Sequence, residues 1–170
     1  TIGLAIKSGL FPFHFWMPDA YGWSTPASAS ILSSLVSKAY IFLLFKVYYR
    51  AIGIDVIART PILKMLFVLG ICGMVMGSVS AIRSETPPRM VAFSSAAQIG
   101  YIYMGIGMGT QAGFAAAMFQ LLTHMVTKSL VFLSAPYLEE ASDNSIRFRQ
   151  LQGAGRRDRT AGAFFTVGAL

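Results

Sequence analysis

The sequence carries little charge for its length. Only 12% of its 170 residues are charged, whereas 55% are hydrophobic. A soluble domain usually has about twice that share of charge. Long apolar stretches with the charges gathered between them are typical of a polytopic membrane protein. The composition therefore excludes an ordinary soluble domain.

Cysteine is nearly absent as well. Cys72 is the only one, and it lies inside an apolar run. This excludes an intrachain disulfide and any all-cysteine metal or iron–sulfur site. Nothing resembles a cleavable signal peptide, and too few residues precede Lys7 to span a bilayer. We expect an internal segment of a longer membrane protein that binds no metal and no cofactor.

The net charge of +7 does not indicate nucleic-acid binding, because most basic residues lie in short loops between apolar runs. A positive-inside bias explains them better. One set of loops holds seven arginines and the opposite set four basic residues, which places the longest loop in the cytoplasm. The first set is Arg83, Arg89, Arg147, Arg149, Arg156, Arg157 and Arg159, and the second is Lys46, Arg50, Arg59 and Lys64.

Four stretches meet or approach the roughly 20 apolar residues that a spanning helix needs. They predict an all-α polytopic transmembrane helix bundle. The four predicted spans are 27–49, 61–82, 90–108 and 114–137. We expect a partial helix at 1–16 before them, a cytoplasmic loop at 138–159, and the start of another helix at 160–170.

The first helix carries residues that interrupt helices. Pro12 removes a backbone donor and clashes with the preceding turn, so we expect a break between Lys7 and Pro12. Unwound backbone at membrane depth survives only where it is buried in protein or faces water. A broken helix beside a lysine resembles the ion-handling helices of transporters. The alternative is an interfacial loop whose aromatic residues form a belt.

Three predicted spans each carry one polar face at helical spacing, about 100° per residue. The face of 114–137 holds Gln120, Thr123, His124, Thr127 and Lys128. The face of 27–49 holds Ser30, Ser33, Ser34, Ser37 and Lys38, and that of 90–108 holds Ser94, Ser95, Gln98 and Tyr101. Serine and threonine stripes also hold helices together, so the stripes alone leave both interpretations open.

The lysines favour a functional interpretation. A lysine at mid-membrane costs about 2.5–3.5 kcal/mol even on a lenient scale, and no Asp or Glu lies within the predicted spans. An amine removed from water gives up its proton more readily, and histidine relays protons through both ring nitrogens. Lys7, Lys38, His124 and Lys128 therefore predict a proton path lined by water. The channel-lining polar residues would be Ser30, Ser34, Ser37, Gln98, Gln120, Thr123 and Thr127.

Other interpretations remain open at this point. His14 and His124 could be the axial ligands of a haem in a membrane electron carrier, or the spans could form an inert scaffold. Four glycines predict close helix packing and no chemistry; they are Gly73, Gly77, Gly105 and Gly109.

Three segments resemble one known family. They are KSGLFPFHFWMPDAYGWSTPASAS, RMVAFSSAAQIGY and FQLLTHMVTKSLVFL. They are similar to signature segments of the antiporter-like proton-conducting subunits, found in complex I membrane arms, Mrp-type cation/proton antiporters and membrane-bound hydrogenases. The resemblance implies an inverted-repeat antiporter-like fold, of which residues 1–170 form helices seven to twelve of one proton-conducting transmembrane domain.

The resemblance also implies residue roles. Lys7 matches the lysine of the broken helix, whose glutamate partner lies on a helix outside this sequence. Lys38 matches a relay lysine, and His124 and Lys128 match a pair on the path through the membrane centre. Two positions depart from the pattern, because Leu32 and Gln120 stand where some members have histidines.

The implied function is proton translocation in an integral membrane protein of a bacterial or archaeal cell membrane or an organellar inner membrane. The chain would be a non-redox pumping subunit of an NADH dehydrogenase (quinone)-like translocase or a subunit of a cation/proton antiporter. Its partners would be other membrane subunits, the lipid bilayer, protons and Na⁺.

Overall fold

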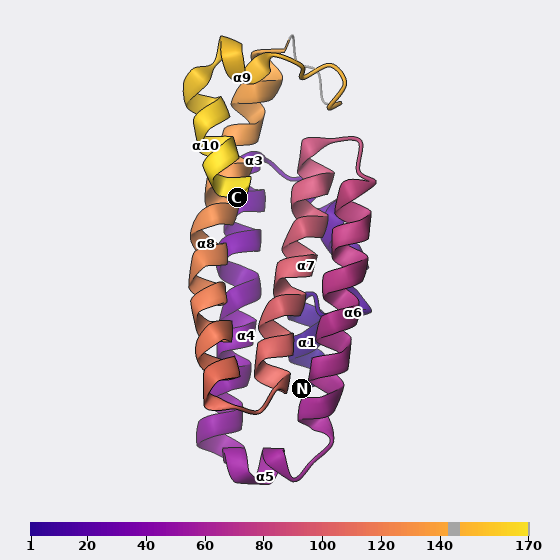
Figure 1. Ribbon diagram of the computed structural model, residues 1–170, viewed down its shortest axis with the longest axis vertical. Coiled ribbons are helices and arrows are strands. Elements are labelled where there is room, and N and C mark those ends of the chain that lie inside the picture. Colours follow the sequence, from indigo (N-terminus) through magenta and orange to yellow (C-terminus); the bar gives the residue numbers. More distant parts are fainter. Residues whose placement is uncertain (143–146, 170) are drawn as a thin grey trace.

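The protein is a bundle of helices that run along one long axis (Figure 1). The computed structural model describes residues 1–142 and 147–169. Every regular element in those ranges is helical, so the predicted all-α fold is confirmed. Part of the predicted loop 138–159 and the last residue of the predicted helix 160–170 lie outside the described residues.

The first helix is divided into short pieces. Helix α1 (Ile2–Ser8) ends at Gly9, whose φ of 84° is left-handed and suits glycine. The Gly9 and Leu10 amides both donate to the Ala5 carbonyl oxygen, at 3.1 and 3.0 Å. A single turn, η1 (Phe13–Phe15), follows Pro12, and then α2 (Trp16–Gly22). The expected helix at 1–16 is thus interrupted between Ser8 and Phe13.

The next helix is long and contains wide turns. It comprises α3 (Pro26–Ile31), a π-helical turn η2 (Leu32–Val36), α4 (Ser37–Lys46) and a second π-helical segment η3 (Val47–Ile52). Thr25 caps its start, with the side chain accepting from the Ser28 amide at 3.4 Å, and Pro26 occupies the first helical position, which suits proline. A short helix, α5 (Ile54–Ala58), leads to the next long helix.

Three long helices complete the bundle: α6 (Ile62–Ile82), α7 (Pro87–Gly107) and α8 (Gln111–Glu140). The short α9 (Ala154–Arg157) and then α10 (Arg159–Ala169) follow, and α10 folds back beside α8 (Figure 1). Helix α7 lies between α6 and α8, and its buried face includes Ser95, Ile99 and Tyr103. This central position brings α7 into contact with most of the polar residues discussed below.

Helices α6 and α7 approach closely through glycines. A Cβ built on Gly100 would lie 2.5 Å from the Met74 backbone nitrogen, and one on Gly77 would lie 2.6 Å from the Ala97 backbone nitrogen. Real side chains essentially never come that near to backbone. Small residues allow such approaches in membrane helix pairs. The structure therefore explains Gly77 as a packing residue.

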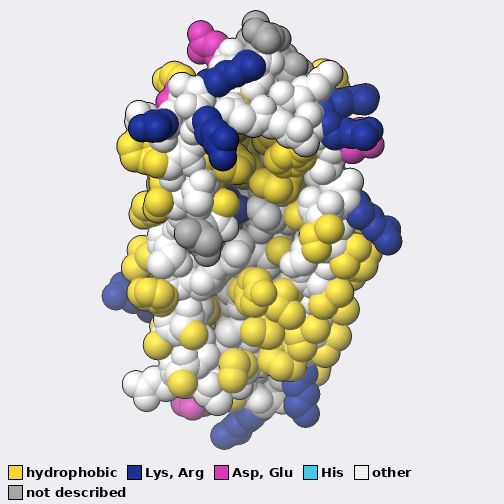
Figure 2. Space-filling model, turned by 45° about the horizontal axis from the view of Figure 1, so that its top comes forward, with side chains coloured by type: hydrophobic (Ala, Val, Ile, Leu, Met, Phe, Trp, Pro, Cys, Tyr) yellow, Lys and Arg dark blue, Asp and Glu magenta, His cyan; other side chains and the backbone are white. Residues whose placement is uncertain are grey.

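The surface is that of a membrane-embedded bundle. By length and composition, three helices in the described part of the chain can cross a membrane: Pro26–Ile52, Ile62–Ile82 and Gln111–Glu140. Hydrophobic side chains cover the flank seen in Figure 2, and Lys and Arg gather toward its two ends. Helix α7 is as long as α6, at 21 residues, but is more polar and more deeply buried. The four predicted spans and their bounds stay predictions.

The glycine contact yields a stability prediction. Replacing Gly100 with alanine should destabilise the bundle by about 1–3 kcal/mol, because the added methyl group overpacks two backbones. Thermal unfolding of the detergent-solubilised full-length protein would measure the loss. Gly3→Ala is the matched control, since a Cβ there meets nothing within 4 Å. Equal melting temperatures for Gly100→Ala and the parent would contradict the packing role.

Candidate functional site

The polar face of α8 lines a cavity of about 420 Å³. Helix α7 supplies the facing wall, and α6 and the end of α10 supply apolar residues. The polar lining consists of Ser94, Gln98, Gln120, Thr123, His124, Thr127 and Lys128. Six of these residues belong to the predicted site. The seventh is Ser94, which the sequence predicts on the polar face of 90–108 but not among the channel-lining residues. None of the lining residues is an acid.

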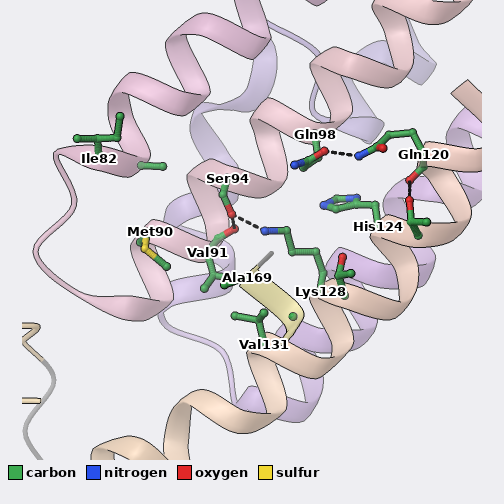
Figure 3. Close-up of a pocket in the computed structure, with 14 residues that line it drawn as sticks. Ile82, Met90, Val91, Ser94, Gln98, Gln120, His124, Lys128, Val131 and Ala169 are labelled. Carbon is green, nitrogen blue, oxygen red and sulfur yellow. Dashed lines mark hydrogen bonds between the residues drawn. The ribbon is translucent and has the colours of Figure 1, made fainter. Parts of the chain in front are cut away.

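Lys128 is almost completely buried, with 8% of its surface exposed. Its Nζ donates a hydrogen bond across the cavity to Ser94 Oγ (Figure 3). The Ser94 hydroxyl in turn donates to the Val91 carbonyl oxygen at 3.0 Å. Because that bond occupies the only Ser94 proton, a lone pair of the oxygen is free to accept from the amine. The serine is therefore oriented to accept a hydrogen bond from Lys128.

His124 extends from α8 toward α7, between the Gln98–Gln120 pair and Lys128 (Figure 3). Its side chain is 1% exposed, and within the described residues neither ring nitrogen has a hydrogen-bond partner. A buried imidazole needs a donor and an acceptor for its two nitrogens. Both nitrogens are closed to solvent in this structure, although the residue borders a cavity of about 420 Å³ that has room for water.

The two glutamines close one part of the cavity. Gln120 Nε2 on α8 donates to Gln98 Oε1 on α7 (Figure 3). Each amide keeps a further donor or acceptor that is not used in this bond. The pair therefore joins the two helices and still presents polar atoms to the cavity.

Lys38 lies outside the cavity, in contact with η2. Its side chain is 2% exposed, and Nζ donates to the Ser33 carbonyl oxygen in the π-helical turn η2. The Ser33 hydroxyl contacts Ser95 Oγ at 3.2 Å, and Ser95 donates to the Val91 carbonyl oxygen at 2.8 Å. The charge of Lys38 also reaches both His124 and Lys128 electrostatically.

Two adjacent serines of α7 therefore face the two lysines. Ser94 bonds Lys128, and Ser95 contacts Ser33, whose carbonyl oxygen holds Lys38. Neighbouring helical residues point about 100° apart, so one helix can address α8 on one side and η2 on the other. Both hydroxyls donate to the same Val91 carbonyl oxygen, which fixes their orientation. The sequence predicts both serines on the polar face of α7 but does not show that each one lies beside a different lysine.

The serines predicted to line the path on 27–49 lie elsewhere. Ser30, Ser34 and Ser37 are buried but are not among the cavity-lining residues. Ser34 donates to the Ser30 carbonyl oxygen at 2.6 Å on its own helix. Ser37 contacts Tyr21 at 3.1 Å and so joins this helix to α2. In the described structure their bonds are those of helix packing.

The residues of the broken first helix are also separate from the cavity. Lys7 lies exposed in the last turn of α1. Pro12 immediately precedes η1, where His14 is buried and stacks on Phe15 with ring centroids 4.6 Å apart. His14 does not line the cavity that holds His124.

Among the residues that the structure describes, no group of three or more His, Cys, Asp or Glu could hold a metal ion.

Solved structures with the same fold define the class of protein. The chain matches the membrane-bound sulfane sulfur reductase, an archaeal respiratory membrane complex, with a TM-score of 0.87 and 29% identity over 98% of this chain and 34% of that one. It matches the Mrp complex from a Dietzia species with a TM-score of 0.77 and 24% identity, covering 99% and 38% of the two chains. The predicted antiporter-like bundle with a broken helix is therefore confirmed.

The sequence comparisons identify the family. The model of the NADH:quinone oxidoreductase/Mrp antiporter transmembrane family matches residues 1–170. NADH-quinone oxidoreductase subunit N of Desulforudis audaxviator is 32% identical over 136 residues, 78% of this chain and 26% of the relative. NAD(P)H-quinone oxidoreductase subunit 5 of Ranunculus macranthus chloroplasts is 31% identical over 147 residues, 86% and 19% of the two chains.

The chain belongs to this family, as the three segments in the sequence indicated, and is an integral membrane protein. It spans about a quarter of the length of the Desulforudis subunit and about a fifth of the chloroplast subunit.

The glutamine pair yields a prediction that separates packing from hydrogen bonding. Gln120→Leu should lower the free energy of unfolding by about 1 kcal/mol, because the half-buried Gln98 amide loses its partner. The double variant Gln98→Leu/Gln120→Leu should cost less than the sum of the two single changes. Denaturant or thermal unfolding of the full-length protein would measure this coupling. Strictly additive losses would show that the two amides do not interact.

Proposed function

We propose that this protein translocates protons across a membrane, through a relay formed by Lys38, His124, Lys128 and water. The observation that carries the proposal is the placement of two buried amines beside two adjacent serines of α7. Lys128 lines the polar cavity and donates to Ser94, and Lys38 donates to the carbonyl oxygen of Ser33, whose hydroxyl contacts Ser95. A structural role alone gives no reason to bury two lysines. Each costs about 2.5–3.5 kcal/mol at mid-membrane.

The arrangement suits a group that changes charge. Lys38, His124 and Lys128 lie within electrostatic range of one another, and no acid lines the cavity. Each added proton therefore makes the next one less favourable, and a proton gained by one group favours release from another. Water beside His124 would connect that ring to Lys128. Thr123, Thr127 and the glutamine pair would hydrogen-bond this water.

Lys7 has a different place in the proposal. It lies beside the break in the first helix, and the family resemblance makes it a switchable charge whose carboxylate partner belongs to another helix. In the described residues Lys7 is exposed at the end of α1. We propose that the rest of the full-length protein covers it.

The parent assembly follows from the relatives. The chain resembles subunits of quinone oxidoreductases and of an Mrp complex. We propose that it works as one membrane subunit among several. Its proton movement would be driven by a redox module in another subunit or by exchange for a cation such as Na⁺.

Lysine substitutions test the relay. The full-length protein, reconstituted with its partner subunits in proteoliposomes, should lose proton transport on the order of 100-fold in Lys38→Ala and Lys128→Ala, because each removes a positioned proton-transfer group. A dye inside the vesicles would report internal pH. Lys64→Ala is the matched control, since Lys64 lies exposed near the start of α6.

Unchanged transport in both lysine variants would rule out the relay and favour an inert scaffold. A sodium gradient imposed on the same vesicles distinguishes the driving reactions. Antiport would drive protons without an electron donor, whereas redox-driven transport would require one.

The serine pair gives a finer test. Ser94→Ala and Ser95→Ala should each slow proton transport by about tenfold, since each removes an acceptor that orients the path beside one lysine. Ser94→Thr retains the hydroxyl and should retain transport. Ser129→Ala is the control, because the Ser129 hydroxyl bonds the Met125 carbonyl oxygen of its own helix at 2.9 Å. A loss of the same size in Ser129→Ala would show that the effect is structural.

A further inference from the structure

A second pocket, of about 560 Å³, lies where α6 ends and α7 begins. It shares no residue with the cavity around His124. Three arginines line it, together with three hydroxyl-bearing side chains. These six residues are Arg83, Arg89, Arg147, Ser80, Ser84 and Thr86.

The fold assembles this pocket from distant segments. Arg83 follows α6 directly, Arg89 lies in the first turn of α7, and Arg147 comes from the segment after α8. The Phe148 amide donates to the Glu85 carbonyl oxygen at 3.1 Å. This backbone bond holds the segment of Arg147 against the α6–α7 turn. The convergence of the arginines therefore depends on a specific tertiary contact.

The pocket carries an excess of positive charge. Its lining has three arginines and one acid, Glu85, an excess of two positive charges. The one ion pair found among the described residues joins Arg89 to Asp19 at 4.0 Å, and these side chains are 61% and 72% exposed. Such an exposed pair neutralises little. Like charges brought together attract an anion, and guanidinium groups match the oxygens of a phosphate in geometry.

An apolar strip leads to the pocket along α6. Val68, Val75 and Val79 are 57%, 49% and 38% exposed. At 100° per residue these three and Arg83 fall within an arc of about 80°. A molecule with an anionic head and apolar chains would therefore contact arginine at one end and valine along its length. Basic pockets at the ends of membrane helices bind such headgroups.

We propose that the pocket between α6 and α7 binds a phosphate-bearing anion through Arg83, Arg89 and Arg147. The hydroxyls of Ser80, Ser84 and Thr86 would donate to the remaining phosphate oxygens. The phosphate could belong to the headgroup of an anionic phospholipid or to free inorganic phosphate. This binding is independent of proton transport and does not involve the lysine relay.

The test uses full-length protein that has been stripped of lipid in detergent. One arm offers mixed micelles of phosphatidylglycerol or of phosphatidylcholine and counts the retained lipid by native mass spectrometry. The other arm titrates inorganic phosphate by calorimetry. The double variant Arg83→Gln/Arg147→Gln should weaken binding by about 25-fold, or about fivefold for each guanidinium. Arg156→Gln is the matched control, because Arg156 is an exposed arginine of α9 outside the pocket.

Each result has a definite meaning. Retention of phosphatidylglycerol over phosphatidylcholine, lost in the double variant but kept in Arg156→Gln, identifies an anionic lipid. Binding of inorganic phosphate that the double variant loses, without a preference between the lipids, identifies free phosphate. Arg83→Lys/Arg147→Lys should keep most of the binding in either case. The proposal is overturned if the double variant and Arg156→Gln bind both ligands as the parent does.

Discussion

The arrangement of the helices around the cavity depends on supplying hydrogen-bond acceptors to two buried amines. Lys38 and Lys128 are 2% and 8% exposed, and no carboxylate lies within ion-pair distance of either among the described residues. A serine hydroxyl and a backbone carbonyl oxygen serve instead. Uncharged acceptors stabilise a buried cation less than a carboxylate does.

These contacts orient α7. The helix bonds α8 through Ser94 and contacts the π-helical turn η2 through Ser95, while η2 also packs directly on α8. Helix α6 packs on another side of α7, where Gly70 and Gly77 of α6 and Gly100 of α7 allow the two backbones to approach closely. Packing on one side of α7 thus supports the polar contacts on the other. The shape of the cavity depends on the close packing of α6 on α7 and on the polar contacts between α7 and α8.

Sequence periodicity was sufficient to find the buried lysines and the buried histidine, but not their neighbours. An apolar helix with Gln120, His124 and Lys128 four residues apart has only one polar face, and that face lines the cavity. The predicted polar face of α7 also includes Tyr101, whose side chain is 42% exposed and does not line the cavity. The spacing of polar residues predicts the direction of each side chain within one helix, but it does not predict which other helix lies opposite. Periodicity therefore cannot predict long-range contacts such as that of Ser33 with Ser95.

The π-helical turn at Leu32–Val36 changes the direction of the side chains that follow it. Its Ser37 amide bonds the Leu32 carbonyl oxygen, five residues back, so the helix winds more slowly there than a constant 100° assumes. Everything from Ser37 to Lys46 is rotated relative to the turns before it. The number of residues in this turn sets the direction of the side chains that follow it. One residue added or removed would redirect Lys38 and the apolar side chains after it, although no side chain had changed in chemistry.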